Sequence, residues 1–476
     1  MTASLRQWVK TCRSELTASY ELICESLRGS DQDYTQGPMN RAIVLLAIPM
    51  VLEMTMESTF AIVDIFFVSK LGADAIAILG ITEAVITLLY AVAIGLSMAV
   101  TALVARRIGE HNPEGAAIVA GQSLWVGVLL SLIIGVGGAI YAEDILRLMG
   151  ASSNAIADHA GYTAIMFGGC GSILLLFLLN GVFRGAGDAS IAMRVLWFAN
   201  GINIVLDPCL IFGLGPFPEL GLAGAAIATT IGRSCGVLLQ FYYLFSGNTR
   251  VRMSLSHLIP RFDEMLHLVH VSIGGIAQFF IATSSWVLLM KIVASYGSVA
   301  IAGYTIAIRI LDFIILPAWG LSNTAATLGG QNLGAAQPER AEQFVWRVAS
   351  YNFVFLMSVG IVLIVIPGPI ISFFTQQPDI IAHAVSCLRW LSFGLGLFAI
   401  GLVLNQAFNG ASDTMTPTKI NFIAFWLVQL PLAYWLALRV VHGPDGVFMA
   451  IFAGESLMTL VAFAIFRRGR WKLVQV

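Results

Sequence analysis

The sequence predicts an all-α polytopic membrane protein whose twelve transmembrane helices form two pseudo-symmetric six-helix lobes. Three observations lead to this fold class: an apolar composition, twelve segments long enough to span a bilayer, and an internal repeat. Of the 476 residues, 58% are hydrophobic and only 11% are charged, and the mean hydropathy is +0.84. Soluble domains carry about 25% charged residues, so a large globular enzyme is excluded.

The spans follow from length, because a helix needs about 20 apolar residues to cross a bilayer. Segments that meet this length fall at 42–69, 76–104, 117–141, 160–183, 191–213, 222–246, 265–294, 299–328, 345–371, 382–408, 417–439 and 446–466. The most polar interior connection, 247–264, follows the sixth span. We therefore predict an amino-terminal lobe over 41–246, a linker over 247–262, a carboxy-terminal lobe over 263–467 and a tail over 468–476.

The first 40 residues precede the lobes and lack the compact apolar run of a cleavable signal peptide. Apolar residues recur there at helical spacing, which favours a helix lying on the membrane surface. The alternative is a polar tail without structure. The residues that set the spacing are Leu5, Trp8, Val9, Cys12, Leu16, Tyr20 and Ile23.

Lys and Arg are distributed unevenly among the connecting segments. With the amino terminus inside, 19 of the 26 fall in inside segments, 3 fall outside (Lys70, Arg147 and Arg439), and 4 lie within spans. Positively charged loops stay in the cytoplasm. We therefore expect a multi-pass protein of the cell (inner) membrane with both termini in the cytoplasm.

Several other classes of function find no support. The six cysteines are scattered without a CxxC spacing, which argues against a disulfide framework or a zinc site. The net charge of −1 gives no sign of nucleic-acid binding. No HExxH, GxSxG or P-loop motif occurs in a suitable context, so we expect no enzyme.

The two halves of the chain repeat each other at an offset of 225 residues. This shift aligns Gly95-Leu96-Ser97 with Gly320-Leu321-Ser322, Gly109 with Gly334, Pro113-Glu114 with Pro338-Glu339, and Gly185-Ala186 with Gly410-Ala411. Each half has an even number of spans, so the repeat is parallel and related by an axis along the membrane normal. Two similar bundles that face each other across a cleft are what alternating access requires.

The repeat fails at the ionisable residues. The same shift pairs Asp64 with Leu289, Asn203 with Val428, Asp207 with Leu432, Glu53 with Gln278, and Glu57 with Ala282. A structural requirement of the fold should appear in both copies, whereas a working site need appear in only one. We therefore expect the functional carboxylates in the first half.

Asn203 and Asp207 lie four residues apart on one face of the fifth span. A carboxylate at membrane depth costs at least ~2.5 kcal/mol and marks an ion or substrate path. With Asp64 of the first span and Thr229 or Thr230 of the sixth, this pair forms an all-oxygen set that suits Na⁺. The two carboxylates could instead hold a proton, and the sequence leaves Na⁺ and H⁺ both open. The structural alternative is that Asn203 and Asp207 only hydrogen-bond each other.

Glu53, Glu57 and Asp64 lie within a narrow arc of the first span and form an acidic stripe. Glu57 could join the ion site or attract a cationic substrate, whereas Glu53 could be a satisfied carboxylate near the interface. Glu83 of the second span is a further candidate for the cleft. Aromatic residues such as Phe60, Trp286 and Trp319 could stack on drug rings, although packing is the commoner role of such residues.

In the second half we expect Arg309, Asp312 and Lys291 to form a buried ion pair that ties two helices, because charges within membranes usually pair. The alternative is that these residues take part in substrate binding. Glu455 and Arg389 have no obvious partner. The turns at 184–188 and 409–413 occur in both halves, and we interpret them as structural because glycine supplies tight turns.

These features resemble the multidrug and toxic compound extrusion (MATE) family over about residues 41 to 466. The resemblance is carried by Val63-Asp64, Phe67-Val68, Leu71-Gly72, Leu148-Met149-Gly150-Ala151, Arg184-Gly185-Ala186-Gly187-Asp188, 203–207 with 210–213, and 221–230. It implies a V-shaped pair of lobes that exports cationic, aromatic, amphipathic compounds in exchange for Na⁺ or H⁺.

The resemblance also implies roles for individual residues. The family's ion ligands fall on Asp64, Asn203, Asp207 and either Thr229 or Thr230, and the proline at which the first span bends falls on Pro49. Another branch of the family carries a glutamate in the seventh span. This chain has Gln278 there, which argues against coupling through the second lobe.

We expect no cofactor beyond the coupling ion, Na⁺ or H⁺. The expected partners are small drug-like molecules and the lipid bilayer, with no nucleic acid, and the expected state is a monomer. The alternative function is a lipid-linked oligosaccharide flippase of the same superfamily. A flippase would need a strongly basic cavity, whereas the predicted spans contain only Arg233, Lys291, Arg309 and Arg389.

Overall fold

The structure is a computed structural model that describes residues 17, 19–30, 32–247 and 249–474. Helices of the first half are α2 (Met39–Val68), η1 (Ser69–Leu71), α3 (Ala73–Gly109), α4 (Pro113–Ile140), α5 (Ala142–Leu148), α6 (Ser153–Gly168), α7 (Cys170–Ala186), α8 (Ala189–Phe212) and α9 (Leu222–Ser246). Those of the second half are η2 (Leu255–Leu258), α10 (Phe262–Ala294), α11 (Ser298–Gly334), α12 (Pro338–Val365), α13 (Pro367–Ser372), α14 (Pro378–Gly410), α15 (Met415–Asn421), η3 (Phe422–Gln429), α16 (Leu430–Trp435), η4 (Leu436–Val440), α17 (Asp445–Arg467) and η5 (Arg470–Leu473). The described residues contain no strand, and twelve of their helical spans are long and apolar enough to cross a membrane.

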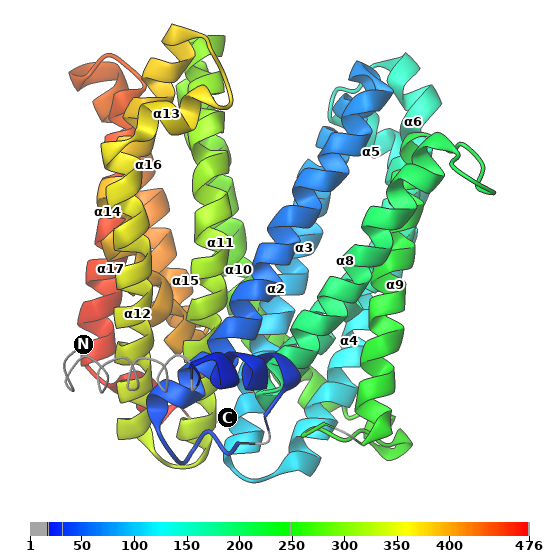
Figure 1. The fold of residues 1–476 in the computed structure, drawn as a ribbon, viewed down its shortest axis with the longest axis vertical. Helices are drawn as coiled ribbons and strands as arrows, with labels where there is room; N and C mark the ends of the chain where they lie inside the picture. The colour runs from blue at the N-terminus through cyan, green and yellow to red at the C-terminus, as the bar shows by residue number, and fades with distance from the viewer. Residues whose placement is uncertain (1–16, 18, 31, 248, 475–476) are drawn as a thin grey trace, which may run out of the picture.

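The helices gather into two lobes that form a V (Figure 1). One arm consists of α2 to α9 and the other of α10 to α17. The arms meet at the end where α2 begins and η5 lies, and they separate towards the end that carries α5 and α13. The predicted fold class, twelve helices in two six-helix lobes, is confirmed.

Two details of the spans differ from the sequence prediction. The fourth span is two helices, α6 and α7, which are separated at Gly169. A Cβ at Gly169 would lie 2.5 Å from Thr230 Oγ1, so the break falls where a side chain of α9 packs closely against this span. In the eleventh span, η3 and η4 are π-helical, whereas the span at the equivalent place in the first lobe, α8, is a regular α-helix.

The repeated glycines lie where the two lobes touch. The lobes pack through α3 against α10 and through α11 against α2. A Cβ at Gly320 would lie 2.5 Å from the carbonyl oxygen of Met50, and a Cβ at Gly95 would overlap the backbone of Ile276. The 225-residue repeat therefore relates the two crossing points between the lobes, and glycine occurs at both because the backbones are nearly in contact.

The same symmetry closes the narrow end of the V. A Cβ at Gly109 would overlap the carbonyl oxygen of Gln331, and a Cβ at Gly334 would overlap that of Arg106. These contacts join the carboxyl ends of α3 and α11. The seal at this end is thus made by two symmetry-related pairs of backbone contacts.

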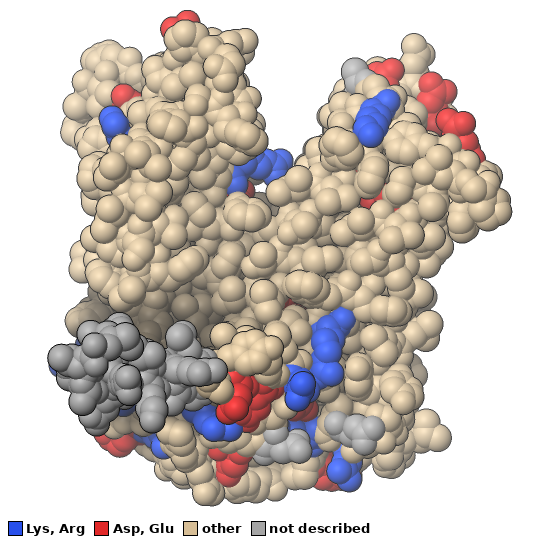
Figure 2. Space-filling view, in the orientation of Figure 1, with Lys and Arg blue, Asp and Glu red and all other residues tan. Residues whose placement is uncertain are grey.

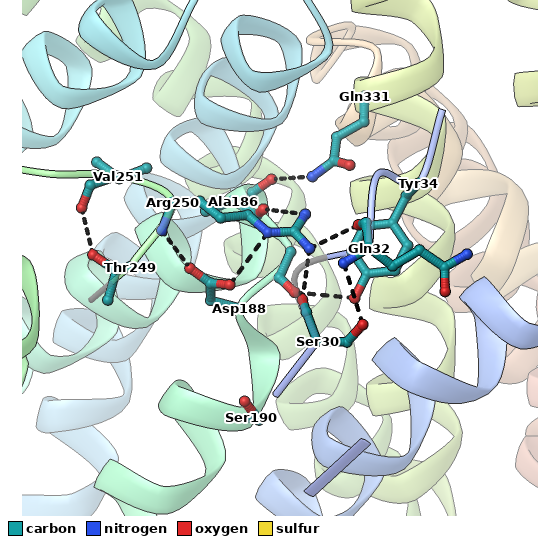
Figure 3. A network of polar contacts seen from close by, with 12 residues as sticks. Ser30, Gln32, Tyr34, Ala186, Asp188, Ser190, Thr249, Arg250, Val251 and Gln331 are labelled. Carbon is teal, nitrogen blue, oxygen red and sulfur yellow. Dashed lines mark hydrogen bonds and ion pairs between the residues drawn. The ribbon is translucent and has the colours of Figure 1, made fainter. Parts of the chain in front are cut away.

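A strap formed by residues 19–30 and 32–38 lies across the narrow end. Arg250, in the connection between the lobes, donates from Nη2 to the carbonyl oxygens of Ser30 and Gln32, at 2.7 Å each (Figure 3). Its Nε lies 3.5 Å from Asp188 Oδ1, and its guanidinium carbon lies 4.7 Å from the ring centre of Tyr34. Burial raises the pKa of the Tyr34 phenol to about 12.

The strap also contacts the second lobe. Arg340 of α12 donates to the carbonyl oxygen of Gly37 at 2.8 Å. Within the strap, residues 19–28 are helical, and Tyr20 and Ile23 are exposed. The other apolar residues of the predicted surface helix, at positions 5 to 16, lie outside the described residues.

The outer surface fits a protein that spans a bilayer. Figure 2 shows Lys and Arg gathered over the narrow end, while the visible faces of both arms are largely uncharged. The space between the arms is hollow in the same view. Charge is therefore concentrated where the chain emerges from the spans.

Candidate ion and substrate sites

The predicted ion ligands lie together inside the first lobe. Helix α8 packs against both α2 and α9. A Cβ at Gly232 of α9 would lie 2.6 Å from the carbonyl oxygen of Ala199 of α8, so these two helices are in close backbone contact. Four polar side chains meet between the three helices, with small exposed fractions: Asp64 9%, Asn203 2%, Asp207 0% and Thr229 7%.

Hydrogen bonds within this group leave several acceptors unused. Asn203 Nδ2 donates to Thr229 Oγ1 at 3.0 Å and to Asp207 Oδ1 at 3.4 Å. The oxygens Asp64 Oδ1, Asn203 Oδ1 and Asp207 Oδ2 are buried and have no hydrogen-bond partner among the described residues. Asp64 also lies close enough to Asp207 for their charges to interact. Because buried polar atoms are normally paired, three orphaned acceptors fit a monovalent cation or a proton.

The hydrogen bonds of the two threonine candidates, Thr229 and Thr230, distinguish them. Thr229 accepts the Asn203 hydrogen bond, whereas Thr230 Oγ1 donates to the carbonyl oxygen of Ala226 in its own helix, at 2.8 Å. Thr230 also fills the space left by Gly169. Thr229 is therefore the threonine of the candidate ion site, and Thr230 has packing contacts.

Arg233 connects this site to Glu57, a role that the sequence did not predict. Its Nη2 lies 3.9 Å from Glu57 Oε1, and its guanidinium carbon lies 5.5 Å and 5.9 Å from the ring centres of Tyr90 and Phe60. It also interacts electrostatically with Asp64. The sequence does contain one indication of this role: Arg233 lies within a predicted span, where an arginine needs a partner.

Glu57 and Glu53 face a second feature, a cavity of about 350 Å³ between the lobes. Glu57 Oε2 accepts from Asn200 at 3.3 Å. Glu53 is 1% exposed, and its Oε1 accepts from Asn180 at 3.2 Å while its Oε2 has no partner among the described residues. Both carboxylates of the acidic stripe therefore border the cavity, while Asp64 lies in the ion site.

The rest of the cavity wall is aromatic, amide and basic. Tyr90 and Phe177 come from the first lobe, and Phe279 and Trp319 from the second. The volume and the apolar wall are typical of a site for a drug-sized molecule. Phe60 packs against Arg233, Glu83 is exposed on α3, and neither is among the described residues that line this cavity.

Arg184 also lines the cavity, which extends our interpretation of the 184–188 turn. The glycines do have packing roles, since a Cβ at Gly185 would lie 2.5 Å from the carbonyl oxygen of Thr101. Gly187 has a φ of +88°, a conformation that favours glycine. The Arg184 side chain, however, belongs to the cavity wall and not only to the turn.

The ion pair predicted in the second lobe is wrong. Lys291, Arg309 and Asp312 are all exposed, and no ion pair joins them among the described residues. Arg309 acts on Asp312 only through longer-range electrostatics, without a contact of ion-pair length. Glu455 borders a separate pocket of about 60 Å³ together with Asp312, and its Oε2 is buried without a partner in the described part of the chain.

Pro49 lies inside α2, next to the contact between the lobes. As proline has no N–H, the carbonyl of Leu45 loses its helical hydrogen bond. The neighbouring residue, Met50, faces Gly320 of α11. The expected bend of the first span would therefore act directly on the packing between the lobes.

Two six-helix lobes, a cavity between them and a polar site buried in one of them define the class of membrane transporters. A family model described as MatE matches residues 49–209 and 276–435, one segment in each lobe. The chain belongs to this family, the MATE multidrug efflux transporters, and the resemblance inferred from the sequence is confirmed.

Individual relatives agree with this assignment. The probable multidrug resistance protein NorM of Thermotoga maritima is 24% identical over 91% of this chain and 93% of its own length. The FAD transporter of Shewanella oneidensis is 26% identical over 90% and 95%. A solved structure described as the outward-facing conformation of a multidrug resistance MATE family transporter is 26% identical, covers 93% of this chain and 98% of its own, and has a TM-score of 0.86.

Proposed function

We propose that this protein is a secondary active antiporter that exports cationic, aromatic, amphipathic compounds in exchange for Na⁺ or H⁺. The observation that carries the proposal is the group of three orphaned oxygens on Asp64, Asn203 and Asp207. An acceptor group of this kind, buried in one of two matching lobes, is costly unless a positive charge occupies it in part of the cycle.

Arg233 offers a route from the ion site to the cavity. It interacts with Asp64 on one side and with Glu57 on the other. A cation or proton on Asp64 and Asp207 removes part of the negative charge that attracts Arg233, so the guanidinium is held more strongly by Glu57. Ion binding then alters the charge environment of Glu57, which lines the substrate cavity. The affinity of the cavity for its substrate therefore differs between the ion-bound and ion-free states, as coupling requires.

The proposed orientation places both termini in the cytoplasm of the cell, in the inner membrane. The V then opens to the outside, and the strap and the glycine contacts close the cytoplasmic end. We propose that the protein acts as a monomer, because the two lobes of a single chain supply both the ion site and the cavity.

A lipid-linked oligosaccharide flippase is not favoured. Arg184 is the one Lys or Arg among the described residues that line the cavity, whereas a pyrophosphate would call for a basic surface. One relative is named for FAD and another for multidrug resistance. The substrate must therefore be argued from this chain's own cavity.

The test is ethidium export from membrane vesicles under an imposed Na⁺ gradient and, separately, an imposed H⁺ gradient. Asp207→Asn and Asp64→Asn should abolish gradient-driven export while the protein remains in the membrane. Thr229→Val should raise the ion concentration for half-maximal export roughly fivefold, from the loss of about one hydrogen bond. Thr230→Val is the matched control and should transport as the parent does. Full ion-dependent export by either aspartate variant would overturn the proposal.

A further inference from the structure

Arg233 is a buried cation that is only partly paired. It lies on α9 and is 5% exposed. In its ion pair with Glu57, Nη2 lies 3.9 Å from Oε1, whereas a close pair of this kind has hydrogen bonds of about 2.8 Å. Its Nη1 is buried and has no hydrogen-bond partner among the described residues. The guanidinium therefore retains a donor for a second carboxylate.

The helices place this guanidinium between two acids. On α2, Glu57 and Asp64 are two turns apart on one face, and Phe60 lies between them along the helix. The guanidinium carbon lies 5.9 Å from the centre of the Phe60 ring, so it faces the stretch of α2 that joins the two acids. On α9, Thr229 of the ion site is one turn away on the same face as Arg233.

The ion site contains the acceptors that match this donor. Asp64 Oδ1 and Asp207 Oδ2 are buried and have no hydrogen-bond partner in the described part of the chain. Arg233 already attracts Asp64 electrostatically. Two carboxylates inside a lobe are costly without a positive charge. When the coupling ion leaves, the guanidinium of Arg233 is the charge that can replace it without leaving the lobe.

The second lobe lacks the cation and the acids together. The 225-residue shift places Met458 at the position of Arg233, and it replaces the two acids of α2 by Ala282 and Leu289. Met458 is 2% exposed, so the fold accepts a buried, uncharged side chain at this position. The arginine is therefore not a requirement of the lobe. It occurs with the acids as part of the ion site.

We propose that Arg233 is a built-in counter-ion of the ion site and competes with the coupling ion for Asp64. In the ion-free site the guanidinium pairs with Asp64, and the arriving ion displaces it towards Glu57 at the edge of the cavity. This inference rests on the proposed antiport function and deepens it, because it assigns to Arg233 the control of ion affinity. A site that keeps a positive charge of its own binds the ion more weakly and releases it more readily.

The experiment measures ion binding to the purified full-length protein in detergent, without any gradient. The unfolding temperature is followed while NaCl replaces choline chloride at a fixed alkaline pH and, separately, while the pH is lowered in choline chloride. Arg233→Gln should lower the ion concentration at the midpoint of the stabilisation roughly tenfold, because a positive charge beside the bound ion is removed. Arg233→Lys keeps the charge and should have a midpoint nearer that of the parent. A residue that only supports the fold would not tighten ion binding when removed.

Arg233→Gln also leaves Glu57 unpaired, so the same titration is made on two variants that lack this carboxylate. Glu57→Gln releases Arg233 to Asp64 and should raise the midpoint concentration severalfold. Arg233→Gln added to Glu57→Gln should lower the midpoint roughly tenfold relative to Glu57→Gln alone. The control is Arg389→Gln, which removes the same group from an exposed position on α14 and should keep the midpoint of the parent.

A midpoint that stays the same or rises when Arg233→Gln is added to Glu57→Gln would overturn the inference. A parent that neither ion stabilises would overturn it as well. Failure of the export function shows differently, as export that does not respond to either ion gradient, while the ion-induced stabilisation and its shift between variants remain measurable.

Discussion

At the scale of single residues, the ion site differs from an ordinary buried polar cluster in its balance of donors and acceptors. One amide nitrogen, on Asn203, serves both Thr229 and Asp207, and three oxygens remain without partners among the described residues. A structural cluster would pair its donors and acceptors. The alternative that Asn203 and Asp207 only lock the helices leaves these three oxygens unexplained.

Arg233 leads to the first prediction. The Arg233 and Glu57 side chains are 6% and 27% exposed, so this ion pair is largely removed from water. Arg233→Gln leaves a carboxylate without its cation and should destabilise the protein by roughly 3 kcal/mol. The double variant Arg233→Gln, Glu57→Gln should regain most of that stability. Thermal unfolding in detergent measures both effects. Equal unfolding temperatures in the single and double variants would show that the pair does not act as a unit.

At the scale of elements, the glycines of α3 and α11 set how closely the two lobes approach. Gly320 faces the carbonyl oxygen of Met50 with no room for a side chain. Gly329 of the same helix is different, because a Cβ added there would meet no heavy atom within 4 Å. The two glycines have the same intrinsic helix propensity. They differ in whether the backbone of the other lobe lies against them.

We therefore predict opposite results for two alanine substitutions in α11. Gly320→Ala should separate α11 from α2 and lower the unfolding temperature by about 4 °C or more. Gly329→Ala should raise it slightly, because alanine favours helix by roughly 1 kcal/mol over glycine. Differential scanning fluorimetry of both variants is the measurement. A similar gain in stability for both would mean that the lobes tolerate a wider spacing at Met50.

The strap is a second element whose position depends on one residue. Arg250 holds the backbone of Ser30 and Gln32 and also pairs with Asp188. Arg250→Ala should release residues 32–38 and speed their amide hydrogen exchange at least severalfold, because these carbonyls lose their charged donor. Arg252→Ala, at an exposed position two residues away, is the control and should leave exchange unchanged. Unaltered exchange in Arg250→Ala would show that other contacts hold the strap.

At the scale of the whole molecule, the distribution of basic residues predicts which end faces the cytoplasm. Arg147 belongs to α5, which lies at the wide end (Figure 1), and Arg252 is two residues from Arg250, which binds the strap at the narrow end. In a cysteine-free background, Arg147→Cys should react in intact cells with a maleimide that does not cross membranes. Arg252→Cys should react only after the cells are made permeable. The reverse pattern would invert the proposed orientation and the direction of transport.

The sequence predicted the spans and the repeat because both depend on local composition and on spacing along the chain. The ion ligands Asp64, Asn203 and Asp207 could be found in the same way, since a carboxylate or carboxamide in an apolar span is visible without a structure. The predicted ion pair at Arg309 and Asp312 failed because burial depends on which face of a helix meets the cleft, and spacing alone does not reveal that face.

By itself, the sequence determined the membrane class, the twelve helices, their duplication and the lobe that contains the unmatched carboxylates. Only the tertiary structure decided that Thr229 and not Thr230 meets Asn203, that Arg233 lies between Asp64 and Glu57, and that Arg184 faces the cavity. The reason is physical: composition and period act along one chain segment, whereas a binding site is made where separate helices meet. Which side chains meet depends on the rotation and separation of those helices, and close glycine contacts between helices set both.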